Sequence, residues 1–444
     1  MNGQIVVRIA RMPGNRRLVE LQRAPNIPDF GPTQFFECDP SSLPDLNQPD
    51  TIRLYGQVLL SKLTSSNEMV RKAVDYALGL GPAASCPIYF NLGGVTDVEQ
   101  FFWEALCDDK GKFLAWDKRW QVGRIADSPR SVPRNPVPFQ APVKIMAIVS
   151  ALGVDAIPEW EAFYKAVNDA RATGLPLRVF AAIGDEHLAD RVSAIVGDNQ
   201  LTSVTITNQT DLLSQLDKFG PHIVHFFCHG STAFGQSELQ LATFNDAGTN
   251  NSSVKLAIDD LLTSAGVRDA WLITLNCCEG GAATKEVHSL TQSLVSQGVY
   301  AAVGMMEAVD ALDAHEFCKY FYPAIFQKLG EILQGIESGD IETLDWVSAL
   351  HAPRVAIRDR HQNLNEKLGR QWALPVLYVQ PEALRVRQPL PAVPVTFGVA
   401  GPTQTSQDED RGHEETIEGL LAMMPPDKRQ GFLQALQEVR ARAK

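Results

Sequence analysis

Short apolar runs alternate with amphipathic stretches from residue 143 onward. Uniformly apolar runs that are too short for helices fit buried strands at 143–149, 177–183 and 204–207. Apolar positions recur at helical spacing between them, over 159–172, 187–196 and 211–218. Because strands and helices alternate, we expect an α/β fold with a mostly parallel sheet that helices cover on both faces.

Two further apolar runs each end in a reactive side chain. Residues 222–230 read His-Ile-Val-His-Phe-Phe-Cys-His-Gly and end in His229 and Gly230. Residues 271–281 read Trp-Leu-Ile-Thr-Leu-Asn-Cys-Cys-Glu-Gly-Gly and contain Cys278. The carboxyl ends of parallel strands meet at one edge of a sheet, where ligands bind. The pattern therefore predicts an imidazole and a thiol at one crevice.

This pair suits nucleophilic catalysis. A free thiol has a pKa near ~8.5, and only the thiolate attacks a carbonyl well. The imidazole of histidine ordinarily titrates close to neutral pH, so His229 is suited to take the proton of Cys278 and return it to a leaving amine. The backbone N–H groups of Gly230 and Cys278 are candidates for an oxyanion hole. A helix expected at 282–297 would begin beside the thiol, and its dipole would favour the thiolate.

Structural and metal-binding interpretations compete with this one. Buried cysteines are common, and a histidine at a strand end is often a hydrogen-bonded core residue. A zinc site would draw on potential ligands in both runs, namely His225, Cys228, His229, Cys277 and Cys278. Alternate residues of a strand face opposite sides, so these five cannot converge. We therefore expect a Cys278–His229 dyad, no metal and no cofactor.

The motif is similar to that of the CHAT domains. The pattern here is an apolar strand that ends in Cys-His-Gly at 228–230, a crossover, and a second apolar strand that ends in Cys-Cys-Glu-Gly-Gly at 277–281. CHAT domains are caspase-like cysteine peptidases of the group that includes separase, gingipain and clostripain. Cys278 falls at the nucleophile position, whereas Cys277 falls on a neighbour that is usually small. The resemblance implies a caspase-like fold and a cysteine endopeptidase acting on a protein substrate.

Acidic residues follow the next buried strand, at 300–306. They are Glu307, Asp310 and Asp313. In separase-like members an acid after this strand contacts a basic side chain at the P1 position of the substrate. The resemblance therefore implies a basic-specific S1 pocket, with Asp310 as first choice and Glu307 as second. The alternative is that Asp310 or Asp313 caps the following helix.

The resemblance extends over roughly 55–380 and suggests several domains. Residues 1–126 read as an N-terminal, caspase-like partner region, with helices at 55–80 and 101–106 and strands at 87–92, 111–115 and 120–125. Five prolines mark 127–142 as a linker. The catalytic domain would span 143–380, with late helices at 314–337 and 341–366 and a strand at 372–378 that closes the sheet.

The remaining residues lie outside the resemblance. Residues 381–412 have the composition of a flexible tether. Residues 413–444 predict a short helical hairpin with Phe432, Leu433, Leu436 and Val439 on one face. Such a hairpin either docks on the protease or binds an activator or adaptor, and we favour the second because the tether is long.

Composition narrows the functional classes. The chain has 444 residues, of which 45% are hydrophobic and 21% are charged, and its net charge of −12 argues against direct nucleic-acid binding. Seven cysteines, no apolar leader and no membrane-length run fit a cytoplasmic protein that does not bind membranes. The phosphate-binding glycine motifs of nucleotide-binding folds are missing. Analogy alone suggests a bacterial defence or stress circuit, and a catalytically silent scaffold acting through the C-terminal helices is the alternative.

Overall fold

The computed structural model describes residues 3–13, 16–25, 27–48, 50–93, 95–127, 135–139, 141–195, 197–233, 236–246, 252–278, 287–335, 340–364 and 367–387. The chain divides into two compact units, Met1–Leu390 and Pro391–Lys444. All described residues belong to the first unit, so the hairpin expected at 413–444 lies outside them.

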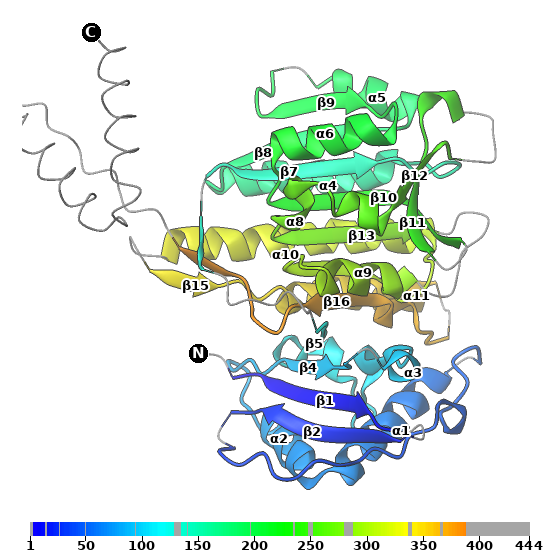
Figure 1. Ribbon diagram of the computed structural model, residues 1–444, viewed down its shortest axis with the longest axis vertical. Coiled ribbons are helices and arrows are strands. Elements are labelled where there is room, and N and C mark those ends of the chain that lie inside the picture. The colour runs from blue at the N-terminus through cyan, green and yellow to red at the C-terminus, as the bar shows by residue number, and fades with distance from the viewer. Residues whose placement is uncertain are drawn as a thin grey trace, which may run out of the picture. The chain divides into compact units, whose positions relative to one another are not determined.

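One continuous sheet runs through the first unit (Figure 1). Its hydrogen-bonded order is β3-β2-β1-β4-β5-β16-β14-β13-β10-β7-β8-β9, with β11 and β12 attached to β10. The strands that precede the expected linker are β1 (Ile5–Arg11), β2 (Arg17–Arg23), β3 (Gln34–Phe35), β4 (Ile88–Asn91) and β5 (Val122–Ile125). The later ones are β7 (Val143–Val149), β8 (Leu177–Ile183), β9 (Leu201–Thr205), β10 (Ile223–Ala233), β11 (Gln236–Leu241), β12 (Val254–Ala257), β13 (Leu272–Cys278), β14 (Ala301–Met305) and β16 (Pro375–Val379).

The sheet consists of two parallel blocks that run in opposite directions. Strands β14, β13, β10, β7, β8 and β9 are mutually parallel, and so are β1, β4, β5 and β16. The blocks meet where β14 pairs with β16 in antiparallel fashion. The carboxyl ends of the block that contains β10 and β13 therefore gather at one edge of the sheet, opposite to those of the block that contains β5 and β16.

Helices cover both faces of the later block, as the alternation predicts. Helix α10 packs against α4 and α11 on one face, and α6 contacts α8 while α7 contacts α9 on the other (Figure 1). The helices are α1 (Thr51–Ser66), α2 (Glu68–Leu78), α3 (Thr96–Glu99), α4 (Ile157–Ala172), α5 (Glu186–Ser193), α6 (Gln209–Phe219), α7 (Ile258–Leu261), α8 (Ala265–Arg268), α9 (Val287–Ser296), α10 (Ala311–Gly335) and α11 (His351–Asn363). None of the described helices is both long and apolar enough to span a membrane.

The helix expected at 55–80 is two helices, because Asn67 interrupts it. The Asn67 side chain accepts hydrogen bonds from the N–H groups of Met69 and Val70, which caps the start of α2. Its amide also donates to the carbonyl of Val19 in β2. The buried asparagine thus fixes the break between α1 and α2.

The strand expected at 111–115 is wrong. The chain forms a 3-10 turn at Leu114–Trp116 instead, since Phe113, Trp116 and Trp372 pack as a cluster with ring centroids 4.5 to 5.1 Å apart. The helix expected at 101–106 is likewise reduced to a 3-10 turn, Trp103–Ala105.

The end of the first unit also differs from the expectation. Strand β16 does not close an edge, because it lies between β14 and β5 and joins the two blocks. The helix expected at 341–366 begins at His351. Residues before it form β15 (Ile341–Thr343), which pairs with β17 (Arg385–Arg387), and β17 pairs with β6 (Val137–Pro138). The first residues of the expected tether are therefore part of a small sheet.

Candidate active site

His229 and Cys278 are register partners on neighbouring strands. Strands β10 and β13 run parallel from Ile223 opposite Leu272 to His229 opposite Cys278. Neighbouring strands lie about 4.8 Å apart, and residues in register occupy the same face. The backbone thus brings together the two positions that the sequence assigns to the dyad. The Cys278 side chain and residues 279–286 lie outside the described part of the chain.

The same register separates the two vicinal cysteines. Cys277 is opposite Cys228, one residue earlier on each strand. Because side chains alternate along a strand, position 277 belongs to the face away from His229. The backbone therefore distinguishes position 278 from position 277 in favour of the motif-based choice.

A backbone carbonyl orients the candidate base. The Nε2 atom of His229 lies 2.7 Å from the carbonyl oxygen of Leu152, just after β7. A carbonyl only accepts hydrogen bonds, so Nε2 carries a proton and donates it. In the neutral ring the lone pair is then on Nδ1. The sequence pattern did not reveal this partner, because it does not give the order of strands that makes β7 the neighbour of β10.

The three candidate acids differ in their surroundings. Glu307 follows β14, and its carboxylate accepts a hydrogen bond from Arg370 at 2.6 Å. Asp313 lies in the first turn of α10, where its side chain is only 2% exposed and is paired with Arg360 and His361. Asp310 is 62% exposed, and its carboxylate accepts a hydrogen bond from the N–H of Leu312 at 2.7 Å. Asp310 is therefore largely exposed to solvent, and its carboxylate also accepts a hydrogen bond from the first turn of α10.

A buried aspartate fixes the base of the loop between β11 and β12. The Oδ2 atom of Asp246 accepts hydrogen bonds from the N–H of Thr243 at 2.8 Å and from the N–H and hydroxyl of Ser253 at 2.9 and 2.7 Å. Burial disfavours its charge, but these hydrogen bonds outweigh that effect and lower the pKa of Asp246. One carboxylate therefore ties together Thr243, which follows β11, and Ser253, which precedes β12.

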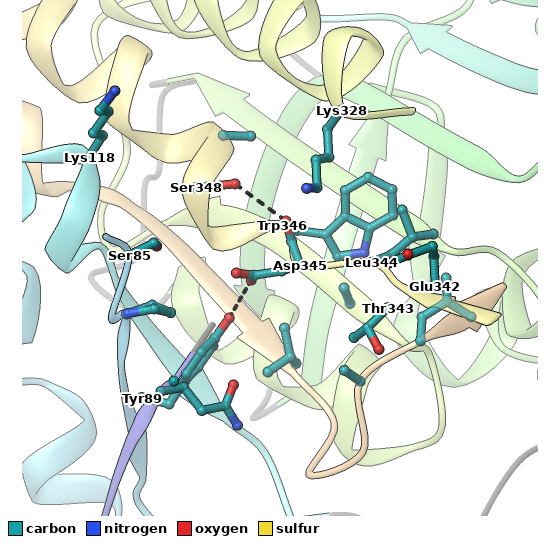
Figure 2. Close-up of a pocket in the computed structure, with 18 of the residues that line it drawn as sticks. Ser85, Tyr89, Lys118, Lys328, Glu342, Thr343, Leu344, Asp345, Trp346 and Ser348 are labelled. Atoms are coloured by element: carbon teal, nitrogen blue, oxygen red, sulfur yellow. Dashed lines mark hydrogen bonds between the residues drawn. The ribbon is translucent and has the colours of Figure 1, made fainter. Parts of the chain in front are cut away.

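A large cleft lies elsewhere on the first unit. It has a volume of about 1400 Å³ and is lined by residues that include Tyr89, Tyr300, Asp345 and Trp346. Figure 2 shows the hydroxyl of Tyr89 donating a hydrogen bond to Asp345, at 2.6 Å. Tyr300 immediately precedes β14, whereas the candidate acids follow the end of that strand. His229, Gly230 and the three acids are not among the lining residues of this cleft, so we do not assign catalysis to it.

A sheet of this topology, with a histidine and a cysteine in register at the ends of neighbouring parallel strands, fits the class of caspase-like cysteine peptidases. The family model of the CHAT domain matches residues 88–375, which is well over half of the chain. The chain belongs to the CHAT domain family, and the resemblance predicted from the two motifs is confirmed. A search of curated protein sequences gives no significant match.

Several solved structures are similar to the chain, all at low identity. The Arg-specific cysteine proteinase gingipain R (RgpB) of Porphyromonas gingivalis has 10% identity and a TM-score of 0.39, over 73% of this chain and 69% of that one. The Saccharomyces cerevisiae separase in complex with securin has 13% identity and a TM-score of 0.33, over 74% of this chain and 17% of that one. The Drosophila initiator caspase Dronc has 6% identity and a TM-score of 0.23, over 45% of this chain and 74% of that one. Similarity at this level carries no argument about substrate or activity.

Proposed function

We propose that the protein is a cysteine endopeptidase in which Cys278 is the nucleophile and His229 is the general base. The Nδ1 atom of His229 takes the thiol proton, and the thiolate attacks the scissile carbonyl carbon of a protein substrate. The same imidazole then protonates the leaving amine, and water hydrolyses the thioester that remains. The N–H groups of Gly230 and Cys278 are proposed to bind the oxyanion.

The observation that carries this proposal is the register pairing of His229 with Cys278. Three further facts support it. Nε2 of His229 is committed to the carbonyl of Leu152, which leaves Nδ1 as the basic nitrogen. Position 277 is on the opposite face of the strand. The chain also belongs to the CHAT domain family, whose catalytic motif its residues 228–230 and 277–281 resemble.

Three single substitutions test the assignment. Cys278→Ala should remove peptidase activity, and His229→Ala should reduce it by roughly 10²- to 10⁴-fold, the usual contribution of a general base. Cys277→Ala should keep most activity and serves as the matched control. Turnover of a mixed peptide library measures these effects, with circular dichroism to confirm that each variant is folded.

Covalent labelling provides a readout that does not depend on finding the right substrate. A peptidyl acyloxymethyl ketone should modify Cys278 in the wild type, as identified by peptide mapping, and the His229→Ala protein much more slowly. Labelling of Cys277 with no labelling of Cys278 would reverse the assignment. A wild type that neither labels nor cleaves would instead favour the catalytically silent scaffold.

The biological setting is also part of the proposal. We propose a cytoplasmic protease that an activator or adaptor recruits through residues 413–444, in a bacterial defence or stress circuit. The composition and charge of the chain support a protein substrate over nucleic acid or a membrane. A protein that lacks residues 413–444 should cleave a short peptide normally and fail to respond to its partner, which co-purification from the native host would identify.

A further inference from the structure

A group of buried polar side chains lies beneath the candidate dyad, on the face of the sheet that α4 and α10 cover. Glu159 comes from the first turn of α4, His225 from near the start of β10 and Cys318 from α10. All three are completely buried. His225 precedes His229 by four residues on the same strand, so it lies on the same face at a distance of about 13 Å along β10.

The ligand atoms of these three residues converge. Nε2 of His225 is 3.1 Å from Oε1 of Glu159, and the carboxylate, imidazole and thiol atoms all lie within 4.8 Å of one another. A point therefore exists that is about 2.8 Å or less from each atom, whereas zinc binds nitrogen, oxygen and sulfur at ~2.0–2.3 Å. A contraction of about 0.5–0.8 Å would bring the three groups to bonding distance.

Several buried polar atoms in this group or directly beside it have no hydrogen-bond partner within the described part of the chain. They include Oε2 of Glu159, Nδ1 of His225 and Oδ1 of Asn276. A buried polar atom without a partner costs free energy comparable to a lost hydrogen bond or more. Such atoms are rare in folded proteins, and several at one place point to an occupant that supplies the missing interactions.

We propose that Glu159, His225 and Cys318 supply three ligands to one buried zinc ion. One oxygen, one nitrogen and one sulfur ligand suit zinc, whereas calcium and magnesium require oxygen ligands. On binding, the Zn–S bond forms as the Cys318 thiol releases its proton to solvent. The ion then carries two positive charges against one carboxylate and one thiolate, so the site is neutral, as a buried position requires.

The neighbourhood adds orientation and a pH dependence. The amide of Asn276 in β13 donates to Oε1 of Glu159 at 2.7 Å and to the carbonyl of Ala314 at 2.9 Å, which fixes the carboxylate against the sheet. Burial and the Glu159 carboxylate raise the pKa of Cys318. Metal binding must overcome that raised pKa, so zinc affinity should fall as the pH falls. The ion would tie α4 and α10 to the strand that carries His229.

Metal content of the purified full-length chain tests the site. Plasma mass spectrometry after gel filtration should find about one zinc per chain in the wild type. Cys318→Ser and His225→Gln should lose it. Cys86→Ser, which alters another buried thiol, and Cys278→Ala, which alters the proposed nucleophile, should keep it. Zinc lost only from Cys278→Ala would place the ion at the dyad and overturn the proposal.

Two measurements on the wild type keep the test decisive if a variant fails to fold. Cobalt added to metal-free protein should give the near-ultraviolet absorption of a Co²⁺–thiolate bond. Zinc should also protect Cys318 from alkylation when the protein is unfolded briefly, as mapped by mass spectrometry. A protein with no zinc, no thiolate band and no protection would overturn the proposal and leave Glu159 and His225 as a buried contact without a metal. None of these readouts requires peptidase activity, so failure of the proposed function and failure of this site are distinguishable.

Discussion

At the scale of single residues, the acids after β14 differ mainly in what already neutralises them. Asp313 is buried against Arg360 and His361, and Glu307 is hydrogen-bonded to Arg370. A carboxylate that is already paired gains less from a substrate cation than one that is not. Asp310 lies 3.9 Å from Arg360 but is mostly exposed, so it remains the first choice for contacting a basic P1 side chain.

We predict that wild-type protein prefers Arg or Lys at P1 and that Asp310→Asn weakens this preference. A charge-assisted hydrogen bond contributes about 1.5–3 kcal/mol, so the ratio of kcat/KM for Arg over Leu substrates should fall roughly 10- to 100-fold. Peptide libraries varied at P1 measure the ratio. Asp340→Asn, at an exposed acid before β15, is the matched control.

Two results would contradict this prediction. Equal cleavage after Leu and Arg by the wild type would rule out a basic-specific pocket. An unchanged ratio in Asp310→Asn would leave Asp310 as a residue that only holds the start of α10, and Glu307→Gln would then be tested in the same assay.

Contacts between residues that are distant in sequence could not be predicted from the sequence pattern. The sequence suggests His225 as a metal ligand only together with the other cysteines and histidines of the two motif regions. Its neighbours in the structure, Glu159 and Cys318, lie on helices far away in sequence, and their apolar surroundings gave no motif. In contrast, His229 and Cys278 can be identified from the sequence because each lies at the end of a recognisable apolar run.

At the scale of elements, a buried ion pair lies beside β5 and contacts β16. The guanidinium of Arg124 in β5 donates to both carboxylate oxygens of Glu104 at 3.0 and 2.8 Å, and both side chains are completely buried. Arg124 also donates to the carbonyls of Glu99 and Phe101 and lies beside the hydroxyl of Tyr378 in β16. This network converts the Trp-Glu segment from the expected helix into a fixed turn.

We predict that Glu104→Gln lowers the free energy of unfolding by about 3–5 kcal/mol, because it leaves a buried guanidinium without its counter-charge. Glu20→Gln is the matched control, since Glu20 pairs with Arg8 at 3.5 Å near the surface and such pairs contribute at most about 1 kcal/mol. Urea unfolding of both variants measures the difference. A loss of less than about 1 kcal/mol in Glu104→Gln would mean that the pair adds little to stability.

The hydrophobic pattern predicts the helices and strands from residue 143 onward better than those before it. Strands β7, β8, β10, β13 and β14 are long or uniformly apolar, and all were expected close to their observed bounds. Short apolar runs such as 111–115 fit several conformations, and only the aromatic partners from distant segments decide among them. Pairing partners are likewise non-local, so the sequence could not show that β16 enters the middle of the sheet.

At the scale of the whole molecule, the first and second halves of the chain are joined by β16, the last strand of the large sheet in chain order. Strand β16 forms five register pairs with β14 and two with β5, and Val376 and Leu377 are completely buried. Until β16 is in place, β14 and β5 are open edges with unpaired backbone groups. The sheet that carries the candidate site is therefore complete only when residues nearly 100 positions after Cys278 have paired with it.

We predict that a chain ending at Arg387 folds, whereas a chain ending at Arg370 does not. The first keeps β16 and β17, while the second removes β16 and exposes the edges of both blocks. Gel filtration and thermal unfolding distinguish a monodisperse, cooperatively melting protein from an aggregate. As a gentler variant, Leu377→Ala in the full-length chain should cost about 2–5 kcal/mol, since it leaves a cavity between the two blocks. Cooperative unfolding of the chain that ends at Arg370, with the wild-type midpoint, would show that the later block is stable by itself and that β16 does not join the halves energetically.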